Sequence, residues 1–362
     1  MTASLPASPS VLLAAGTATG AGTSVALVEA CRTLSAQVHS GSIARAEVHL
    51  PPQANDAAKA ASGLSLVRPG RLSAIAGEVI SRSQTDIYIG FADRLPITPK
   101  GNQFRVMVVQ NPHLYESTEA PSLGKAARIA RTRWARWSAT KADLVVCSTE
   151  ASRGALMSAI PSLRPERIIV RPIRPETPQP RGEVAAVIET VILLGDLYSY
   201  KRFDVALDGV TAWATERGNP EEIRVVHCGS PRDDLAVSHF QAAVTRARSE
   251  GLTVDERGPV NHDEAMNALL EADVLVSASE VETQGLTILE ALAVGVPVLA
   301  RGIGPVIDVA GTAFEAFPVT GEAQDIAEGL TRMTGLERRR ELVQAGLERA
   351  QMSAGWNLLP DW

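Results

Sequence analysis

The stretch DVLVSASEVETQGLTILEALAVGVPVLA runs from Asp273 to Ala300 and contains a complete strand, helix and strand. DVLVSAS and VPVLA are short apolar runs typical of buried strands, and LTILEALAV is an apolar segment long enough for a short helix. Gly295 and Pro297 favour a left-handed helix end followed by a break. This order predicts a parallel sheet, with the loop EVETQG at the carboxyl edge of its first strand.

The same alternation continues through both halves of the 362 residues. The other strand-like runs are SVLLAAG, TDIYIGF, RVMVVQN, DLVVCST and RIIVRPI in the first half, and VILLGDL and RVVHCGS in the second. Most are apolar at successive positions, as strands covered on both faces are. Helical stretches lie between them, one with a capping box formed by Asn261 and Glu264. The sequence therefore predicts an α/β protein of two doubly wound, Rossmann-like domains facing a cleft.

A proline-rich segment divides the chain. RPIRPETPQPRGEV, from Arg171 to Val184, has four prolines and few apolar residues, which predicts an extended linker. We expect an N-terminal domain over residues 1–170, the linker over 171–184, and a C-terminal domain over 185–340. Residues 341–362 are expected to form a helix that packs back toward the N-terminal domain.

The composition favours a soluble globular protein over a membrane-spanning or secreted one. Hydrophobic residues make up 45% and charged residues 21%, as in soluble globular proteins. No apolar run reaches the roughly 20 residues of a membrane-spanning helix. The N-terminus lacks the basic region of a signal peptide, and Cys31, Cys147 and Cys228 lie far apart, so we expect a cytoplasmic protein.

Charge is unevenly distributed along the chain. Residues 1–180 hold 20 Lys and Arg against 12 Asp and Glu, and the remainder holds 15 against 29. This indicates either different partners for the two halves or simple surface drift. Overall acidity and the absence of a known binding module argue against nucleic acid.

The loop and helix of the opening stretch carry the candidate site. Gly285 allows close approach of a ligand, and the first amides of the helix, on Leu286 and Thr287, form an anion site. Glu290 leans back toward that site from apolar surroundings, where a carboxylate needs hydrogen-bond donors such as two sugar hydroxyls. With Glu282 at the other end of a bound phosphate, the pattern predicts a nucleotide sugar. The alternative, equally open on spacing alone, is a structural Glu290 bonded to nearby backbone and a solvated Glu282.

SEVETQGLTILEALAVGVPVLA resembles the Glu-x7-Glu signature of retaining GT-B glycosyltransferases of family 4, group 1, which include many bacterial cell-surface sugar transferases. The family usually has Glu-Gly-Phe-Gly-Leu before the second glutamate, and here Gln284 stands at the phenylalanine position. VILLGDLYSYKRFDVAL is similar to the family's GRL…KG.D segment. VVHCGSP, ADLVVCSTEASRGAL, NHDEAMNALLEADVLVSAS and GAGTSVALVEACRTL resemble further family segments in the same order.

The resemblance implies a GT-B fold, an acceptor-side first domain, a nucleotide-sugar donor domain, and a role for each matching residue. Glu290 would bind the donor ribose, and Glu282 would contact donor sugar hydroxyls. Lys201 would neutralise the leaving diphosphate, although it could also be a surface lysine beside a helix. The remaining donor-site residues implied are Gly285, Leu286 and Thr287 for phosphate, Gly195 at the end of its strand, and Arg202 as a helper cation.

One position departs from the family pattern. The family commonly has arginine directly after the glycine of its first donor strand, and this chain has Asp196 after Gly195. The departure weakens the predicted phosphate clamp. Arg202 or a basic residue of the other domain compensates, or donor affinity is low, or the chain is a degenerate relative.

Two first-domain loops complete the candidate residues. Gly20 and Gly22 open a helix after SVLLAAG, and Val25 stands where a dinucleotide fingerprint needs a third glycine, so the NAD interpretation is weak. The family places this loop near the donor phosphates and acceptor. His113 in QNPHLYES lies at or near a histidine that relatives place by the sugar, and is a candidate catalytic residue. The alternative is a solvated loop histidine.

The implied reaction moves a sugar from a UDP- or GDP-linked donor to the hydroxyl of a glycan, lipid-linked sugar or small molecule, with retention. Cell-surface polysaccharide or glycoconjugate synthesis is the implied setting. The chain has no Asp-x-Asp motif and no His or Cys cluster, so we expect no metal and no cofactor. A catalytically idle sugar-nucleotide-binding subunit is the alternative, and a sugar-nucleotide epimerase is a third interpretation with no positive sign.

A basic helix with tryptophans, LGKAARIARTRWARWSATK, raises the question of a membrane surface. Basic residues with interfacial Trp134 and Trp137 can dock on anionic lipid at the inner face of a membrane. We favour the alternative in which the tryptophans pack into the domain, because the basic residues surround the helix.

Overall fold

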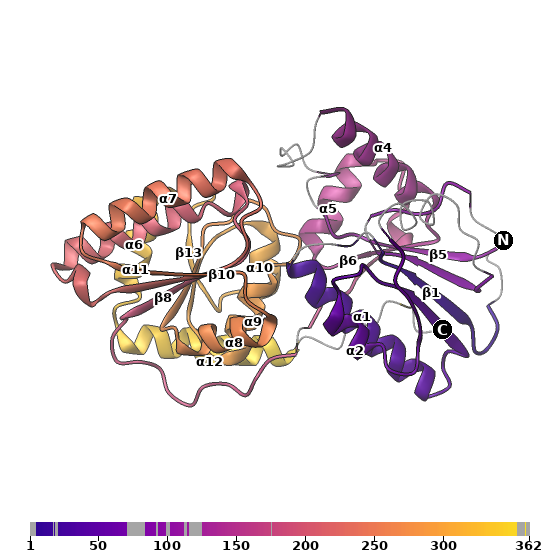
Figure 1. The fold of residues 1–362 in the computed structure, drawn as a ribbon, viewed down its shortest axis with the longest axis horizontal. Coiled ribbons are helices and arrows are strands. Elements are labelled where there is room, and N and C mark those ends of the chain that lie inside the picture. Colours follow the sequence, from indigo (N-terminus) through magenta and orange to yellow (C-terminus); the bar gives the residue numbers. More distant parts are fainter. Residues whose placement is uncertain are drawn as a thin grey trace. The chain divides into compact units, whose positions relative to one another are not determined.

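The computed structural model describes residues 5–16, 18, 21–70, 84–91, 93–98, 102–111, 114–115, 125–174, 176–352 and 359, and Figure 1 shows its ribbon. The chain divides into two compact units. Unit 1 comprises Met1–Pro175 and Gly355–Trp362, and unit 2 comprises Glu176–Ala354. Each unit is an α/β domain with a parallel sheet.

Unit 1 contains a seven-stranded sheet in the order β3-β2-β1-β4-β5-β6-β7. Its strands are β1 (Ser10–Ala14), β2 (Arg45–His49), β3 (Ser65–Val67), β4 (Ile87–Gly90), β5 (Phe104–Val108), β6 (Leu144–Cys147) and β7 (Ile168–Val170). Its helices are α1 (Ala21–His39), α2 (Asn55–Ala60), α4 (Lys125–Lys141), α5 (Glu150–Ala159) and the 3-10 turn η2 (Pro165–Arg167). The order reverses direction between β1 and β4, as in doubly wound sheets.

Helix α4 packs one side into unit 1. Ala135, Ser138 and Ala139 are buried against the sheet, and the indole N–H of Trp134 donates to the Leu95 carbonyl at 2.9 Å. The Arg94 guanidinium lies 5.2 Å from the Trp134 ring centre. For Trp134 the structure therefore matches the packed alternative of the sequence analysis.

Unit 2 contains a six-stranded sheet in the order β10-β9-β8-β11-β12-β13. Its strands are β8 (Thr190–Leu194), β9 (Arg224–Cys228), β10 (Thr253–Gly258), β11 (Val274–Ser277), β12 (Val298–Arg301) and β13 (Glu315–Phe317). Its helices are α6 (Phe203–Arg217), α7 (Asp234–Ser249), α8 (His262–Glu271), α9 (Leu286–Val294), α10 (Gly304–Ala310), α11 (Ala323–Arg332), α12 (Leu336–Met352), and the 3-10 turns η3 (Ser199–Lys201) and η4 (Pro220–Glu222).

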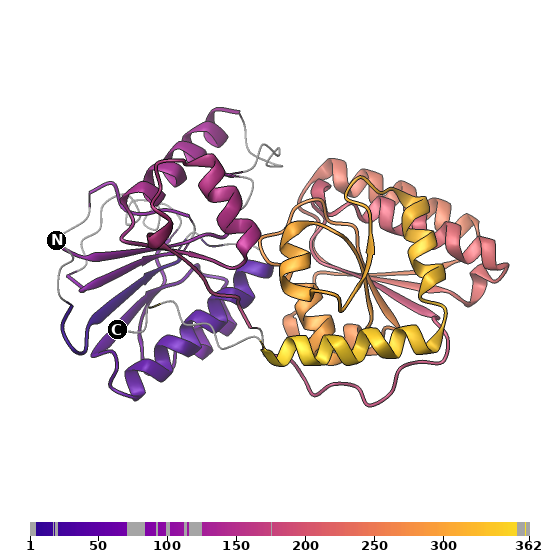
Figure 2. The same ribbon diagram turned by 180° about the vertical axis from the view of Figure 1, so that it is seen from behind.

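The central strand β8 is buried on both faces. Val191 and Leu193 pack in the cluster of α6, α7 and α11, whereas Ile192 and Leu194 pack in the cluster of α8, α9 and α10. Figures 1 and 2 show α6, α7 and α11 over one face of the sheet and α8, α9 and α12 over the other. This two-sided cover explains why VILLG is continuously apolar in the sequence.

Local predictions in unit 2 are confirmed where the residues fix backbone geometry. Asn261 and Glu264 form the predicted capping box at the start of α8. Gly295 ends α9 in the left-handed conformation, with a φ of 75°. Within residues 171–184, the described positions form neither helix nor strand. The last helix of unit 2, α12, packs against α9 of the same unit.

The structure adds four strands that the sequence patterns did not identify: β2, β3, β10 and β13. β10 is an edge strand of sequence TVDERG, and β3 is an edge strand of three exposed residues. Edge and peripheral strands lack the continuous apolar character of β8, so they escape a search for apolar runs. Among the described residues, no helix is long and apolar enough to cross a membrane.

Candidate functional site

Two loops of unit 2 meet where its sheet changes direction. β8 and β11 are neighbours in the sheet although β9 and β10 lie between them in sequence. The loop after β11 joins the loop after β8 through the Glu280 amide, which donates to the Tyr200 carbonyl at 2.8 Å. The switch point of an open parallel sheet is where such folds bind ligands.

The N-terminus of α9 opens onto this edge. Gly285 is its cap residue in the left-handed conformation, with a φ of 82°, and no side chain caps the helix. The first amides with an intrahelical acceptor are those of Ile288 and Leu289, which both donate to the Gly285 carbonyl at 3.1 Å. The amides of Leu286 and Thr287 therefore keep their donors for an acceptor outside the helix.

Glu290 lies inside the protein, one turn further along α9. Its side chain is 4% exposed, and its Oε1 atom has no hydrogen-bond partner among the described residues. Burial raises the pKa of its carboxyl group to about 8. The nearest ion-pair partner is His262, whose Nδ1 lies 3.9 Å from Oε1, beyond hydrogen-bond distance. Among the described residues no backbone group is bonded to this Oε1, which argues against the structural alternative for Glu290.

Glu282 is paired with Lys201. The Lys201 Nζ lies 2.5 Å from Glu282 Oε1, and the two side chains are 16% and 12% exposed. Lys201 also lies 5.7 Å from the centre of the Tyr200 ring, which stacks on Tyr198 at 5.4 Å. Glu282 is thus not a solvated side chain, and the lysine and glutamate predicted to act on the donor contact each other.

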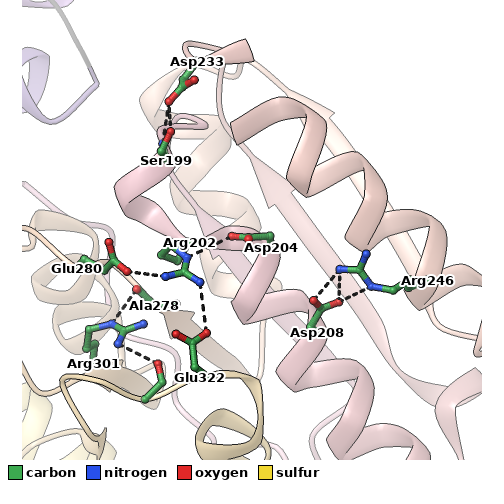
Figure 3. A network of polar contacts seen from close by, with 11 residues as sticks. Ser199, Arg202, Asp204, Asp208, Asp233, Arg246, Ala278, Glu280, Arg301 and Glu322 are labelled. Carbon is green, nitrogen blue, oxygen red and sulfur yellow. Dashed lines mark hydrogen bonds and ion pairs between the residues drawn. The ribbon is translucent and has the colours of Figure 1, made fainter. Parts of the chain in front are cut away.

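Arg202 extends toward a second set of acids, shown in Figure 3. Its guanidinium lies 2.6 Å from Glu280 and 3.3 Å from Glu322, and 3.8 Å from Asp204. Burial lowers the pKa of Arg202, but the hydrogen bond and charges of these acids outweigh it and raise that pKa. A phosphate would therefore have to compete with carboxylates for this arginine.

Arg202 also adopts an unusual backbone conformation, with a φ of 49°. It stands where the GRL…KG.D pattern has glycine. We expect Arg202→Gly to be more stable than Arg202→Ala by about 1 kcal/mol, because only glycine enters the left-handed region without cost. Urea unfolding of both variants measures the difference.

The same pair of substitutions at Arg246, inside α7, is the matched control. There the alanine variant should be the more stable by about 1 kcal/mol, because the backbone is helical. Equal stability of the two Arg202 variants would contradict a strained Arg202.

Asp196 has a structural partner of its own. Its carboxylate accepts from the Ser230 amide and from the Arg232 Nε, both at 2.9 Å. Asp196 therefore ties the loop after β8 to the loop after β9 and holds a cation there. Arg232 is 43% exposed.

The loop after β9 also presses against Gly195. A Cβ atom on Gly229 would lie 1.9 Å from the Gly195 carbonyl oxygen and 2.9 Å from the Asp196 amide. His227 Nε2 lies 3.1 Å from the same carbonyl, and burial, partly offset by this hydrogen bond, lowers the pKa of that imidazole. Gly229 is thus required by close packing of two backbones.

We expect Gly229→Ala to destabilise the protein by about 2–3 kcal/mol, because the clash is with backbone that must shift. Thermal unfolding measures the effect. Gly154→Ala is the control, since a Cβ there meets nothing within 4 Å. A G229A protein as stable as G154A would show that the two loops separate easily.

Arg301 supports the glutamate loop of unit 2. Its buried guanidinium donates to the carbonyls of Ala278 and Gly321, at 3.1 and 2.9 Å, and so fixes the start of that loop.

Unit 1 has a buried acid of its own. Asp93 is fully buried after β4, has a φ of 60°, and accepts from the Gln110 amide and the Tyr115 hydroxyl at 3.0 and 3.2 Å. Burial raises the pKa of Asp93 in spite of these bonds.

The structure brings most predicted donor residues together at one sheet edge. Gly195, Lys201 and Arg202 follow β8, whereas Glu282, Gly285, Leu286, Thr287 and Glu290 follow β11. Gly22 lies in α1, and Gly20 and His113 fall outside the described residues. Sequence patterns missed His262, Gly229 and Arg301. The capping box was the available signal for His262, because it fixes where α8 begins.

Comparison with solved structures identifies the architecture. Anabaena HepE (Alr3699), in complex with UDP and glucose, superposes with a TM-score of 0.71 at 16% identity over 96% of this chain and 95% of that one. The fold is GT-B. Sucrose-phosphate synthase of Thermosynechococcus elongatus shares this GT-B fold, with a TM-score of 0.69 at 14% identity over 96% and 95% of the two chains.

A family model matches within unit 2. Residues 188–349 of this GT-B chain match the family model of glycosyl transferases group 1. D-inositol 3-phosphate glycosyltransferase of Corynebacterium diphtheriae is 30% identical over 130 residues. That match covers 35% of this chain and 30% of the relative's own length.

Proposed function

We propose that this protein is a retaining glycosyltransferase that transfers a sugar from a nucleoside diphosphate donor to an acceptor hydroxyl. The observation that carries the proposal is the buried Oε1 of Glu290, which has no hydrogen-bond partner in the described part of the chain, beside the free amides that begin α9. A pair of ribose hydroxyls supplies the donors that this carboxyl group lacks, and a pyrophosphate fits the helix N-terminus. The GT-B neighbour HepE has been solved in complex with UDP-glucose and with UDP and glucose, which supports a UDP-linked donor.

In the proposed reaction, the bond between the sugar C1 and the pyrophosphate oxygen breaks, and a new bond to the acceptor oxygen forms on the same face. The acceptor proton passes to the departing phosphate. Lys201 and the amides of Leu286 and Thr287 stabilise the charge that develops on that phosphate. No metal is required, which the absence of an Asp-x-Asp motif supports. The acceptor is a glycan, lipid-linked sugar or small molecule, and the setting is cell-surface or glycoconjugate synthesis.

A thermal-shift screen of UDP-, GDP- and dTDP-sugars tests donor binding, since a bound ligand raises the unfolding temperature by mass action. Release of nucleoside diphosphate, unchanged by EDTA and lost in Glu290→Ala, tests turnover. If none of these donors raises the unfolding temperature, the proposal is rejected. Turnover abolished by EDTA would reject its metal-independent form.

One observation favours a second candidate, an idle sugar-nucleotide-binding subunit. Three cations at this edge are paired with acids: Lys201 with Glu282, Arg202 with Glu280, and Arg232 with Asp196. A clamp neutralised in this way binds phosphate weakly. Donor binding without any release of diphosphate, with a range of sugar acceptors, would favour the idle subunit.

A further inference from the structure

The proposed ribose ligand has a neighbour with no assigned role. His262 is the first residue of α8, and the capping box of Asn261 and Glu264 fixes its backbone. Its Nδ1 lies 3.9 Å from Oε1 of Glu290, the oxygen for which the described residues provide no hydrogen-bond partner. The imidazole is 36% exposed and the carboxyl group 4% exposed. His262 thus lies between a buried acid and solvent.

Other charged groups near α9 are engaged elsewhere. On α12, Arg349 donates to the carbonyls of Asp308 and Val309 at the end of α10. On β12, Arg301 donates to backbone carbonyls, and before α9, Glu282 pairs with Lys201. β11 consists of uncharged residues, and α9 has no charged residue besides Glu290. Within the part of the chain that the structure describes, His262 is the titratable side chain within ion-pair distance of Glu290.

Ribose hydroxyls change what this carboxyl group needs. Without a ligand, burial favours its neutral form, because nothing compensates a charge there. When two hydroxyls donate to it, the anion becomes the better acceptor, since hydrogen bonds to charged groups are roughly twice as strong as neutral ones. The proton must then leave the carboxyl group, and histidine is the side chain that takes up a proton near neutral pH.

We propose that His262 is a positioning residue of the donor site, which accepts the proton of Glu290 when ribose hydroxyls of a nucleotide sugar bind that carboxyl group. The inference rests on the proposed function. The Oε–H bond breaks, an Nδ1–H bond forms, and the ribose hydroxyls keep their own protons. The resulting imidazolium and carboxylate form an ion pair, which orients the carboxylate to accept hydrogen bonds from the ribose hydroxyls. The gap between them has to close by about 1 Å to reach hydrogen-bond distance.

The direct test is nitrogen NMR of protein with labelled histidine at pH 7.5, with and without saturating UDP-glucose. His262→Gln identifies the His262 signal. We expect that signal to change from the neutral to the protonated pattern on binding, and to stay neutral in Glu290→Gln. A His262 that stays neutral in the complex of the unmodified protein would overturn the inference.

The pH dependence of the affinity for UDP-glucose gives a second readout, which a merely structural histidine would not change. In His262→Gln we expect affinity about tenfold weaker than the unmodified protein at pH 6.5, because the carboxyl group keeps its proton. At pH 9 the difference should fall below about twofold, since the carboxyl group is then already ionised. An equal loss of affinity at both pH values would mean that His262 acts by packing alone.

A third measurement needs no nucleotide and separates the two proposals. Carbon NMR of the glutamate carboxyl groups in the free protein follows the titration of Glu290, which E290Q identifies. We expect H262Q to raise the midpoint of that titration by about half a pH unit or more, because the acid loses its proton acceptor. An unchanged midpoint would overturn the inference even if UDP-glucose binds. A shifted midpoint with no binding of any donor would instead reject the proposed function.

Discussion

Lys201→Ala is expected to lower the turnover number about 10²- to 10³-fold. Charge develops on the diphosphate as the sugar leaves, and removal of one preorganised stabilising group commonly costs this much. The substitution also leaves Glu282, a 12% exposed carboxylate, without its cation next to the incoming phosphate. Release of nucleoside diphosphate at saturating donor measures the effect on the chemical step.

Glu282 makes a double-mutant cycle informative. Adding Glu282→Gln to K201A should recover part of the donor affinity, because the uncompensated acid is gone, but little of the rate. Lys59→Ala is the matched control, since Lys59 is 80% exposed and pairs with a surface aspartate. If K201A keeps more than about a tenth of the turnover, the leaving group is stabilised elsewhere, and Arg232 is then the first residue to test.

Glu290→Gln is expected to change both stability and donor affinity. The folded-state pKa of about 8 lies above the ordinary value of 4.5, so the folded protein holds a proton that the unfolded chain loses between these pH values. Stability of the unmodified protein should therefore fall by about 4 kcal/mol in total as pH rises from 4.5 to about 8. E290Q lacks this group, so its stability relative to the unmodified protein should rise by that amount.

Urea unfolding of both proteins at pH 5 and pH 8 measures the difference between their unfolding free energies at each pH. Groups other than Glu290 titrate in both proteins, so their contributions cancel in this difference. Glu337→Gln, at a 79% exposed carboxylate of α12, is the control and should show no such change. Donor affinity of E290Q should fall about 10- to 100-fold, because a neutral amide replaces the charged acceptor. A constant stability difference from pH 5 to pH 8 would show that Glu290 titrates normally.

The fold could be predicted in detail where strands are covered on both faces. β8, β9, β11 and β12 have apolar centres, and the helix between β11 and β12 ends at Gly295 in the left-handed conformation, which glycine adopts without cost. The edge strands β3 and β10 could not be found in this way, since solvent on one side removes the pattern. The sheet order, with β8 next to β11, depends on packing that no single segment encodes.

The candidate site was only partly predictable for a related reason. The glutamates, the glycine and the helix start lie in one continuous stretch, so the sequence predicts that they lie near one another, although their spacing alone leaves a structural Glu290 equally open. Partnerships across sequence were not visible: Lys201 with Glu282, Asp196 with Arg232, and His262 with Glu290 join residues 28 to 81 positions apart. Arg202 was expected to face phosphate, and its guanidinium instead contacts Glu280 and Glu322. Each pairing depends on which loops the sheet brings to one edge.

The contact between Lys201 and Glu282 has a consequence for how fast a donor arrives. The charge of a lysine that is paired with a glutamate produces little electrostatic field in solvent. A diphosphate approaching from bulk water is therefore not steered to the site by this lysine. Encounter should then be governed by ordinary diffusion, with an association rate constant that hardly varies with added salt. Lys201 can attract the diphosphate only after Glu282 has moved to contact the donor sugar, when the donor is already bound in the site.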